Sequence, residues 1–264
     1  HIREIVAIAR DREVKVIEDC AQSPLALLDG RPVGTFGDIG AFSTNDSKHV
    51  SCGEGGFVIT SDGEMAGIAR LFIDKTYAKG KARGETDVTF LGFNYRMTEL
   101  SAAILEVQLR KLEEQIRRRA AYAERLAAGL EGIAGLRVVK PRAGTRCAYW
   151  FLLACLEPER LTADRTTIVQ ALSGEGIGVW AALSPASTLY GTTALREKRL
   201  YPFGRTAPAQ FLKDRRYESG LCPVAERIAA TVMCFPVSPF YTEEDADETI
   251  AGIRKVFAHY RAGK

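Results

Sequence analysis

The stretch VKVIED, residues 14–19, decides how the first part of this chain folds. It is a short, largely apolar run that ends in the acidic pair Glu18 and Asp19, a pattern typical of a buried strand. A second run of this kind covers residues 39–43, and helical patterns precede and follow the two runs. Strands that alternate with helices indicate an α/β fold with a mostly parallel sheet. Because such sheets bind ligands beyond the carboxyl ends of their strands, Asp19 is expected at a ligand-binding edge.

The longest helical pattern lies in the middle of the chain and separates two regions. Thr98 can cap its first turn, and apolar residues then recur at helical spacing as far as Ala123. The chain closes with a helix over residues 242–260, which opens on Thr242 and three acidic residues. Further strands are expected over residues 57–60, 136–139, 148–156 and 178–182, helices over 62–72 and 164–174, and a mobile loop over 75–89. The expected domains are a large domain (1–108), a linking helix (109–134) and a small α+β domain (135–264).

The composition is that of an ordinary globular protein, and it excludes several classes of function. Hydrophobic residues make up 46% and charged residues 26% of the 264 residues, and the net charge is +3. That charge is too small to indicate nucleic acid or a membrane surface as a partner, and no apolar run approaches the roughly 20 residues that cross a bilayer. The six cysteines contain no C-x-x-C pair, so neither a disulfide framework nor a zinc site is expected. We expect a cytoplasmic protein without a metal.

Four features of the first hundred residues can together carry chemistry: Asp19, Ser43, Lys48 and the GEGG turn at residues 53–56. A lysine amine forms a Schiff base with an aldehyde when it is unprotonated. A carboxylate can keep a pyridine nitrogen protonated, and a hydroxyl can bind a phosphate. Taken singly, each residue has a more ordinary explanation, such as a turn-forming Asp or a solvated surface Lys. The argument therefore depends on the order and spacing of all four.

These motifs resemble those of the DegT/DnrJ/EryC1/StrS family of sugar aminotransferases, which are pyridoxal-phosphate enzymes of fold type I. Residues 17–22 (IEDCAQ) match the family's IEDAAQ segment, and Lys48 follows Asp19 at the spacing of the family's cofactor lysine. The GEGG turn matches the motif beyond that lysine, and residues 92–103 (GFNYRMTELSAA) match a third segment. The resemblance spans nearly the whole chain. It implies a three-layer, mostly parallel sheet of the aspartate-aminotransferase type in an incomplete large domain, plus a smaller α+β C-terminal domain.

The resemblance also implies a pyridoxal 5'-phosphate cofactor and assigns roles to five residues. Lys48 would hold the cofactor as a Schiff base and, once released, would move the proton in the 1,3-shift. Asp19 would pair with the pyridine nitrogen, and Gln22 would lie beside the ring. Ser43 would bind the phosphate. Asn94 would reach the phosphate from a neighbouring subunit, so a homodimer with shared active sites is expected.

The activity that the resemblance implies is transamination. Glutamate or glutamine would donate an amino group, and a keto sugar nucleotide or a ketocyclitol would accept it, in the biosynthesis of amino sugars, cell-surface polysaccharides or antibiotics. Two alternatives stay open. One is a dehydratase of the same family, in which His replaces the lysine; the other is a non-catalytic relative that keeps the fold for regulation or assembly. Lys48 stands at the lysine position and favours transamination, although His49 follows it directly.

The chain departs from the family pattern in three places. Thr44 stands where the family usually has an aromatic residue, and Asp46 and His49 flank the lysine. Residues 181–201 differ most from the region that lines the family's substrate pocket. The family's N-terminal part, with a small-residue phosphate loop and an aromatic residue that stacks on the cofactor ring, is missing from this chain. These departures leave the sugar or cyclitol open and predict a cofactor site that is incomplete within the chain.

Overall fold

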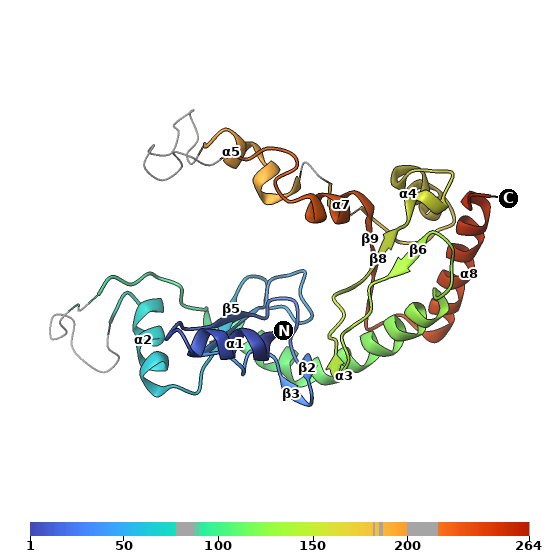
Figure 1. Cartoon of the computed structure of the whole chain (residues 1–264). Coiled ribbons are helices and arrows are strands. Elements are labelled where there is room, and N and C mark those ends of the chain that lie inside the picture. Colours follow the sequence, from blue (N-terminus) through green and yellow to red (C-terminus); the bar gives the residue numbers. More distant parts are fainter. Residues whose placement is uncertain (78–87, 89, 182, 185–186, 200–215, 264) are drawn as a thin grey trace. The chain divides into compact units, whose positions relative to one another are not determined.

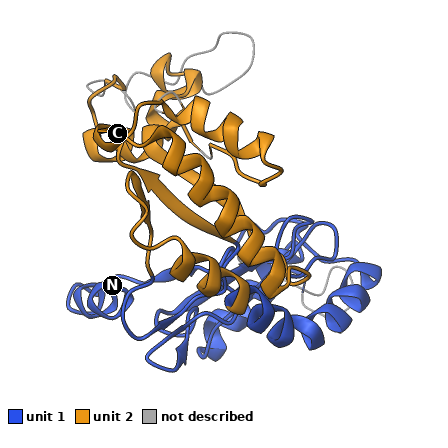
Figure 2. Cartoon of the chain, turned by 90° about the vertical axis from the view of Figure 1, so that its right-hand side faces the viewer, with its two compact units in different colours: residues 1–120, 141–150 blue, residues 121–140, 151–264 orange. Residues whose placement is uncertain are grey.

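The computed structural model describes residues 1–77, 88, 90–181, 183–184, 187–199 and 216–263 (Figure 1). The chain divides into two compact units (Figure 2). Unit 1 comprises His1–Ala120 and Pro141–Trp150, and unit 2 comprises Ala121–Lys140 and Phe151–Lys264. The long helix α3 (Glu99–Gly129) contributes residues to both units. All five residues to which the resemblance assigns a role therefore belong to unit 1.

A three-stranded sheet with the order β1-β4-β5 forms the centre of unit 1. Strands β1 (Ile17–Asp19) and β4 (Ile39–Ser43) are parallel, and β5 (Gly56–Ile59) lies antiparallel beside β4. The expected mostly parallel sheet is thus found only in part, because among the described residues β1–β4 is the parallel pair. The connection from β4 to β5 explains the difference. Residues 44–55 form a loop without the crossover helix that usually joins parallel neighbours.

The remaining parts of unit 1 place the loop after β4 against a hydrophobic core. Within this core, Leu105 and Leu112 of α3 cluster with Val50 and Cys52 of the loop. Thr98 caps α3 as expected, since its Oγ1 accepts the backbone N–H of Ser101 at 3.1 Å. The other elements are α1 (Ile2–Arg10), α2 (Gly63–Ile73), and the short strands β2 (Leu27–Leu28), β3 (Arg31–Pro32) and β7 (Thr145–Arg146). Strand β2 pairs with both β3 and β7, so residues 141–150, which follow α3, return to unit 1.

Unit 2 contains an antiparallel sheet with the order β6-β8-β9. Its strands are β6 (Leu136–Val138), β8 (Phe151–Leu156) and β9 (Val232–Pro236), and helices α4 (Arg165–Gly174) and α8 (Glu243–Tyr260) contact each other. The helix expected over residues 242–260 is confirmed, and its first turn carries a capping box between Thr242 and Asp245. Shorter helical segments are η1 (Pro158–Arg160), η3 (Leu189–Gly191), α5 (Thr193–Arg196) and α7 (Pro223–Thr231).

Two further expectations from the sequence are not confirmed. The strand expected over residues 178–182 is wrong, because in its described part only Trp180 pairs, in an isolated bridge with Cys234. The loop expected over residues 75–89 lies mostly outside the described residues, as do several positions between 181 and 201. Across the described ranges, no helix is both long and apolar enough to cross a membrane.

Candidate active site

Asp19 and Ser43 lie at the same edge of the sheet in unit 1. Each is the last residue of its strand, and the two strands are parallel neighbours. Asp19 stands opposite Ala41 in the register, and Ala41 and Ser43 point to the same face because side chains alternate along a strand. The Asp19 carboxylate is exposed and accepts the backbone N–H of Ala21 at 3.0 Å. A carboxylate and a hydroxyl therefore lie on one face at the carboxyl ends of two parallel strands.

Lys48 is carried by the loop between β4 and β5, residues 44–55. The loop is closed at its base, where the Thr44 N–H donates to the carbonyl of Gly55 at 3.0 Å and the Cys52 N–H donates to the carbonyl of Thr44 at 3.1 Å. Thr44, which replaces the family's usual aromatic residue, is completely buried there and contacts the Cys52 sulfur. Within the loop, the Lys48 N–H donates to the carbonyl of Asn45. These bonds hold the lysine on a short, closed segment directly after the strand that ends in Ser43.

The GEGG turn completes the base of this loop and has little room for side chains. A Cβ atom on Gly55 would lie 2.9 Å from the Thr44 hydroxyl, and one on Gly56 would lie 2.6 Å from the carbonyl oxygen of Phe42. Gly53 has a φ of +92°, a conformation that favours glycine. The glycines therefore allow the loop to return close enough to β4 for Gly56 to pair with Ser43.

The Lys48 side chain lies against Trp150, which sequence reasoning did not identify. The Lys48 Nζ is 3.9 Å from the centre of the indole ring, within the range of a cation–π interaction. The indole Nε1–H of Trp150 donates to the carbonyl of Ser47 at 2.8 Å. Trp150 is far from Lys48 in the sequence, and a single sequence has no local signal that would reveal the contact.

His49, directly beside the lysine, is buried and uncharged near neutral pH. Burial, with the Arg119 and Lys48 charges adding to it, lowers the pKa of His49 to about 4. Its Nε2 lies 3.2 Å from the carbonyl oxygen of Ala148, so this nitrogen carries the proton and donates it. In the sequence, His49 stands out only as an unusual residue beside the lysine. The structure places it inside unit 1 as a support of the loop.

Glu18 is a second residue whose role sequence reasoning missed. It is buried, on the opposite face of β1 from Asp19, and its carboxylate accepts three backbone N–H groups. The donors are Gly34 at 2.7 Å, Phe36 at 2.6 Å and Gly37 at 2.7 Å. Glu18 therefore ties the turn before β4 to β1. The sequence does carry a signal for this role. Side chains alternate between the two faces of a strand, so when Asp19 is exposed the adjacent Glu18 must point into the protein.

Gln22 and Asn94 stand in different surroundings. Gln22 is exposed in the turn that follows β1. Asn94 is exposed, forms a backbone bridge with Asp74 beyond α2, and accepts the Arg96 Nε–H at 3.0 Å. The structure thus brings Asp19, Gln22 and Ser43 to one region of unit 1, with Lys48 on the adjoining loop. Within the described chain, Asn94 makes no hydrogen bond or ion pair with any of these four residues.

Arg96 has a clear structural role. Its guanidinium lies 3.3 Å from the Asp74 carboxylate, which also contacts Lys75. The rings of Phe93 and Tyr95 stack 5.2 Å apart, and both lie beside the ring of Phe72 in α2. The segment that carries Asn94 is therefore held to α2 by an ion pair and by aromatic packing.

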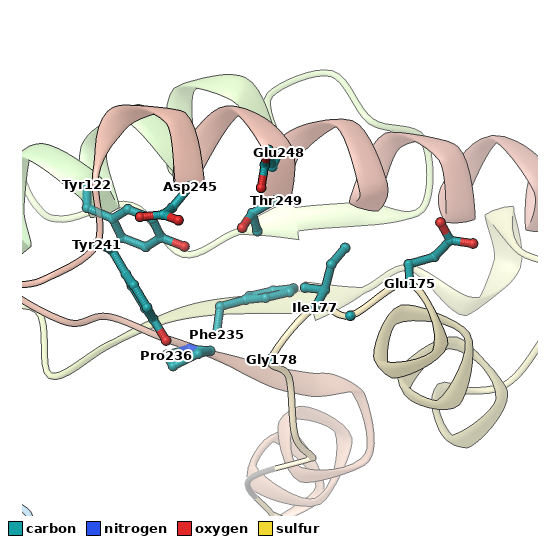
Figure 3. A pocket seen from close by; sticks show the side chains of 11 residues that line it. Tyr122, Glu175, Ile177, Gly178, Phe235, Pro236, Tyr241, Asp245, Glu248 and Thr249 are labelled. Atoms are coloured by element: carbon teal, nitrogen blue, oxygen red, sulfur yellow. The ribbon is translucent and has the colours of Figure 1, made fainter.

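The described residues include two cavities that bear on the location of the site. A groove of about 700 Å³ lies along the sheet of unit 1 and is lined by Ile39, Ala41 and Val58, with α2 on its other side. Ala41 belongs to the face that carries Asp19 and Ser43. A smaller cavity, about 240 Å³, lies in unit 2 (Figure 3). Its lining includes the rings of Tyr122 and Tyr241 but none of the residues predicted from the sequence.

The donor set at the sheet edge fits a phosphate-bearing pyridine aldehyde. It offers an amine in Lys48, an exposed carboxylate in Asp19, a hydroxyl in Ser43 and an amide in Gln22. These are the groups that such a ligand requires for its aldehyde, ring nitrogen, phosphate and ring oxygen. The geometry therefore agrees with a cofactor-binding edge.

Comparisons with known proteins agree with this geometry. The sequence profile of the DegT/DnrJ/EryC1/StrS aminotransferase family matches residues 1–254. L-glutamine:2-deoxy-scyllo-inosose aminotransferase of Streptoalloteichus tenebrarius is 31% identical over 96% of this chain and 61% of its own length. UDP-N-acetyl-3-dehydro-alpha-D-glucosamine 3-aminotransferase of Acidithiobacillus ferrooxidans is 32% identical over 95% of this chain and 59% of its own length.

A solved structure shows the same relationship in three dimensions. The aminotransferase TlmJ of Streptoalloteichus hindustanus superposes with a TM-score of 0.72 at 29% identity, over 97% of this chain and 62% of that protein. The chain thus spans about 60% of the length of the relatives that it matches. On both the profile match and the identity to these relatives, the chain belongs to the DegT/DnrJ/EryC1/StrS aminotransferase family.

Proposed function

We propose that this protein is a pyridoxal-phosphate-dependent aminotransferase that acts on a keto sugar nucleotide or a ketocyclitol. The observation that carries the proposal is the sheet edge of unit 1. There, Asp19 and Ser43 end two parallel strands on one face, and Lys48 follows on the closed loop. Two relatives support the substrate class, because one is named for 2-deoxy-scyllo-inosose and glutamine and the other for a UDP-linked keto sugar.

In this proposal each residue supplies one function to the site. Lys48 would bind the cofactor aldehyde and would later carry the proton between the substrate carbon and the cofactor. Asp19 would keep the ring nitrogen protonated, Ser43 would bind the phosphate, and Gln22 would orient the ring from the turn after β1. When bound, pyridoxal phosphate supplies the electron sink that makes the substrate C–H bond acidic. The amino donor is glutamate or glutamine, and the products belong to amino sugar, polysaccharide or antibiotic biosynthesis in the cytoplasm.

The finer features of the fold are part of the same proposal. Unit 1 would be part of a large, three-layer cofactor domain of the type I fold, with residues 1–108 in that domain. Residues 109–134 would form the linking helix, and residues 135–264 the small domain, of which residues 141–150 pack in unit 1. The continuous helix α3, which contributes to both units, supports a helical link.

A homodimer is the assembly that we propose. Asn94 lies among exposed apolar side chains, including Leu91 at 87% and Tyr95 at 64% exposure. Leu100, Ile104 and Val107 are also exposed, at helical spacing along the start of α3. Exposed apolar side chains of this kind favour contact with another protein surface. In the proposed dimer a second copy covers them, which would bring Asn94 to the partner's site.

The test is an absorbance titration of the protein with pyridoxal phosphate, in parallel with Lys48→Ala and Lys15→Ala. We expect a visible band that Lys48→Ala abolishes, that Lys15→Ala preserves, and that glutamine or glutamate bleaches. Lys15 is the matched control, since it is an exposed lysine of the same unit. A band that survives Lys48→Ala, or no band in the unaltered protein, would overturn the proposal and favour a non-catalytic member of the family.

A further inference from the structure

Residues 47–49 meet residues 148–150 in three consecutive contacts. The Ser47 carbonyl accepts the indole N–H of Trp150 at 2.8 Å. The Lys48 ammonium lies 3.9 Å from the centre of the same indole ring. The His49 ring donates to the carbonyl of Ala148 at 3.2 Å. The lysine is thus bracketed on both sides by hydrogen bonds to one distant segment.

The local bonds of the loop leave the lysine side chain undirected. The Lys48 backbone N–H donates to the carbonyl of Asn45, but the side chain has four rotatable bonds and loses rotamer entropy when it is held in one direction. No hydrogen bond or ion pair with a described residue reaches its ammonium group. The contact with Trp150 is therefore the interaction that gives the side chain a direction in this structure.

The segment that carries Trp150 holds an unusual backbone conformation. Tyr149, a bulky residue, has a φ of +48°, in the left-handed region that is unfavourable for such residues. The Arg119 guanidinium donates to the Tyr149 carbonyl at 3.4 Å, and Ala148 is buried in the core beside Val50. Strained residues of this kind persist only where the surrounding structure holds them, and they are concentrated at functional sites. Here the strain lies at the residue before the ring that contacts Lys48.

We infer that Trp150 is a positioning residue for Lys48. Its N–H holds the backbone of the loop, and its ring holds and shields the amine. The inference rests on the proposed function, in which Lys48 is the reactive lysine. It adds that the amine is held in a defined direction before any cofactor binds, by a residue that lies outside the motifs.

The test measures how fast each lysine is acetylated by trace acetic anhydride at a constant pH, with peptide mapping by mass spectrometry. Lys15 is the internal reference, because its side chain is 68% exposed in the same unit. The variants are Trp150→Leu, which removes both ring and N–H, and Trp150→Phe, which keeps a ring. Trp180→Leu is the matched control, since Trp180 is the other tryptophan and lies in unit 2.

We expect Trp150→Leu to raise the acetylation of Lys48 relative to Lys15 about threefold, the size of a cation–π contact at a partly exposed site. Trp150→Phe should give an intermediate value, and Trp180→Leu should leave the ratio unchanged. A ratio unchanged in Trp150→Leu overturns the inference. If Trp150→Leu does not fold, a ratio in folded Trp150→Phe equal to that of the unaltered protein overturns it instead.

This experiment separates the inference from the proposed function because acetylation requires no cofactor. A Lys48 ratio that responds to Trp150, in a protein without a visible band on adding pyridoxal phosphate, supports the positioning role and overturns the proposed function. A visible band that depends on Lys48, together with a Lys48 acetylation ratio that Trp150→Leu leaves unchanged, supports the proposed function and overturns the positioning role.

Discussion

The side chains that are most completely buried differ between the two units. In unit 2 they are large and apolar, such as Phe235, Phe257 and Met233, which are at most 2% exposed. In unit 1 the buried side chains also include polar and charged ones. Every buried polar or charged residue in the described part of the chain belongs to unit 1, namely Glu18, Thr44, His49 and Thr76. Unit 1 also leaves large apolar side chains exposed on its sheet, on α2 and along the start of α3.

This difference shows which interactions stabilise each unit. Unit 2 is stabilised by dense apolar packing, which depends on volume and tolerates no cavities. Unit 1 uses buried hydrogen bonds to shape the turns at the edge of its sheet, and these bonds carry a large penalty when one partner is lost. The two tryptophans can report on the units separately, since Trp150 lies in unit 1 and Trp180 in unit 2.

The largest expected effect is the loss of packing in unit 2. Phe235→Ala should lower its free energy of unfolding by about 3–5 kcal/mol, because the side chain is 1% exposed and leaves a cavity. Urea unfolding followed by Trp180 fluorescence, with Trp150 replaced by Phe, measures the change. Phe240→Ala is the control and should cost less than about 0.5 kcal/mol, since Phe240 is 82% exposed. An equal loss recorded by Trp150 fluorescence in a second protein, which keeps Trp150 and has Trp180 replaced by Phe, would show that the units unfold together and would break the comparison.

The next effect tests the buried carboxylate of unit 1. Glu18→Gln should lower the free energy of unfolding by roughly 2–3 kcal/mol, because the amide cannot accept from all three backbone N–H groups and turns a donor toward one of them. Trp150 fluorescence during urea unfolding, with Trp180 replaced by Phe, is the measurement. Glu106→Gln, which removes an exposed pair with Arg110 on α3, should change it by less than about 0.5 kcal/mol. Similar losses in the two variants would contradict the role given to Glu18.

A pH dependence follows from the buried histidine. The pKa of His49 is lowered from 6.5 to about 4 in the folded chain, so between these values the unfolded chain binds more protons. Stability should therefore fall as the pH drops from 6.5 toward 4, by about 2 kcal/mol from this group. Unfolding of unit 1 at pH 7 and pH 4.5 measures the fall, which His49→Gln should reduce. His259→Gln alters an exposed histidine of unit 2 and should leave the pH dependence of unit 1 as it was.

The smallest expected effect is local and should be alike in both units. Thr242→Ala removes the cap of α8 and Thr98→Ala the cap of α3, and each should cost about 1 kcal/mol. Hydrogen exchange of the first turn of each helix measures the loss, and Thr242→Ser should restore most of it. A cost that differs several-fold between the two helices would show that the surroundings, rather than the cap itself, dominate at these positions.

Much of the local structure could be predicted from the sequence because its causes are local. The strand over residues 39–43 has the predicted bounds, and Thr98 and Thr242 cap the helices that they were expected to cap. The sheet was predicted less well, because pairing direction depends on the path of the connection, and the loop over residues 44–55 has no crossover helix. The roles of Asp19, Gln22, Ser43, Lys48 and Asn94 remain predictions, although the first four lie in one region.

The sequence by itself determined the family, the strand ends that carry Asp19 and Ser43, and the position of Lys48 directly after them. These features depend on the order of residues and on short-range periodicity, which a single chain displays. Only the tertiary structure decided what surrounds the lysine: Trp150 under its ammonium, Ala148 beside His49, and a buried Glu18 behind the strand. Such contacts join residues far apart in the chain, and only the packing of unit 1 brings them together.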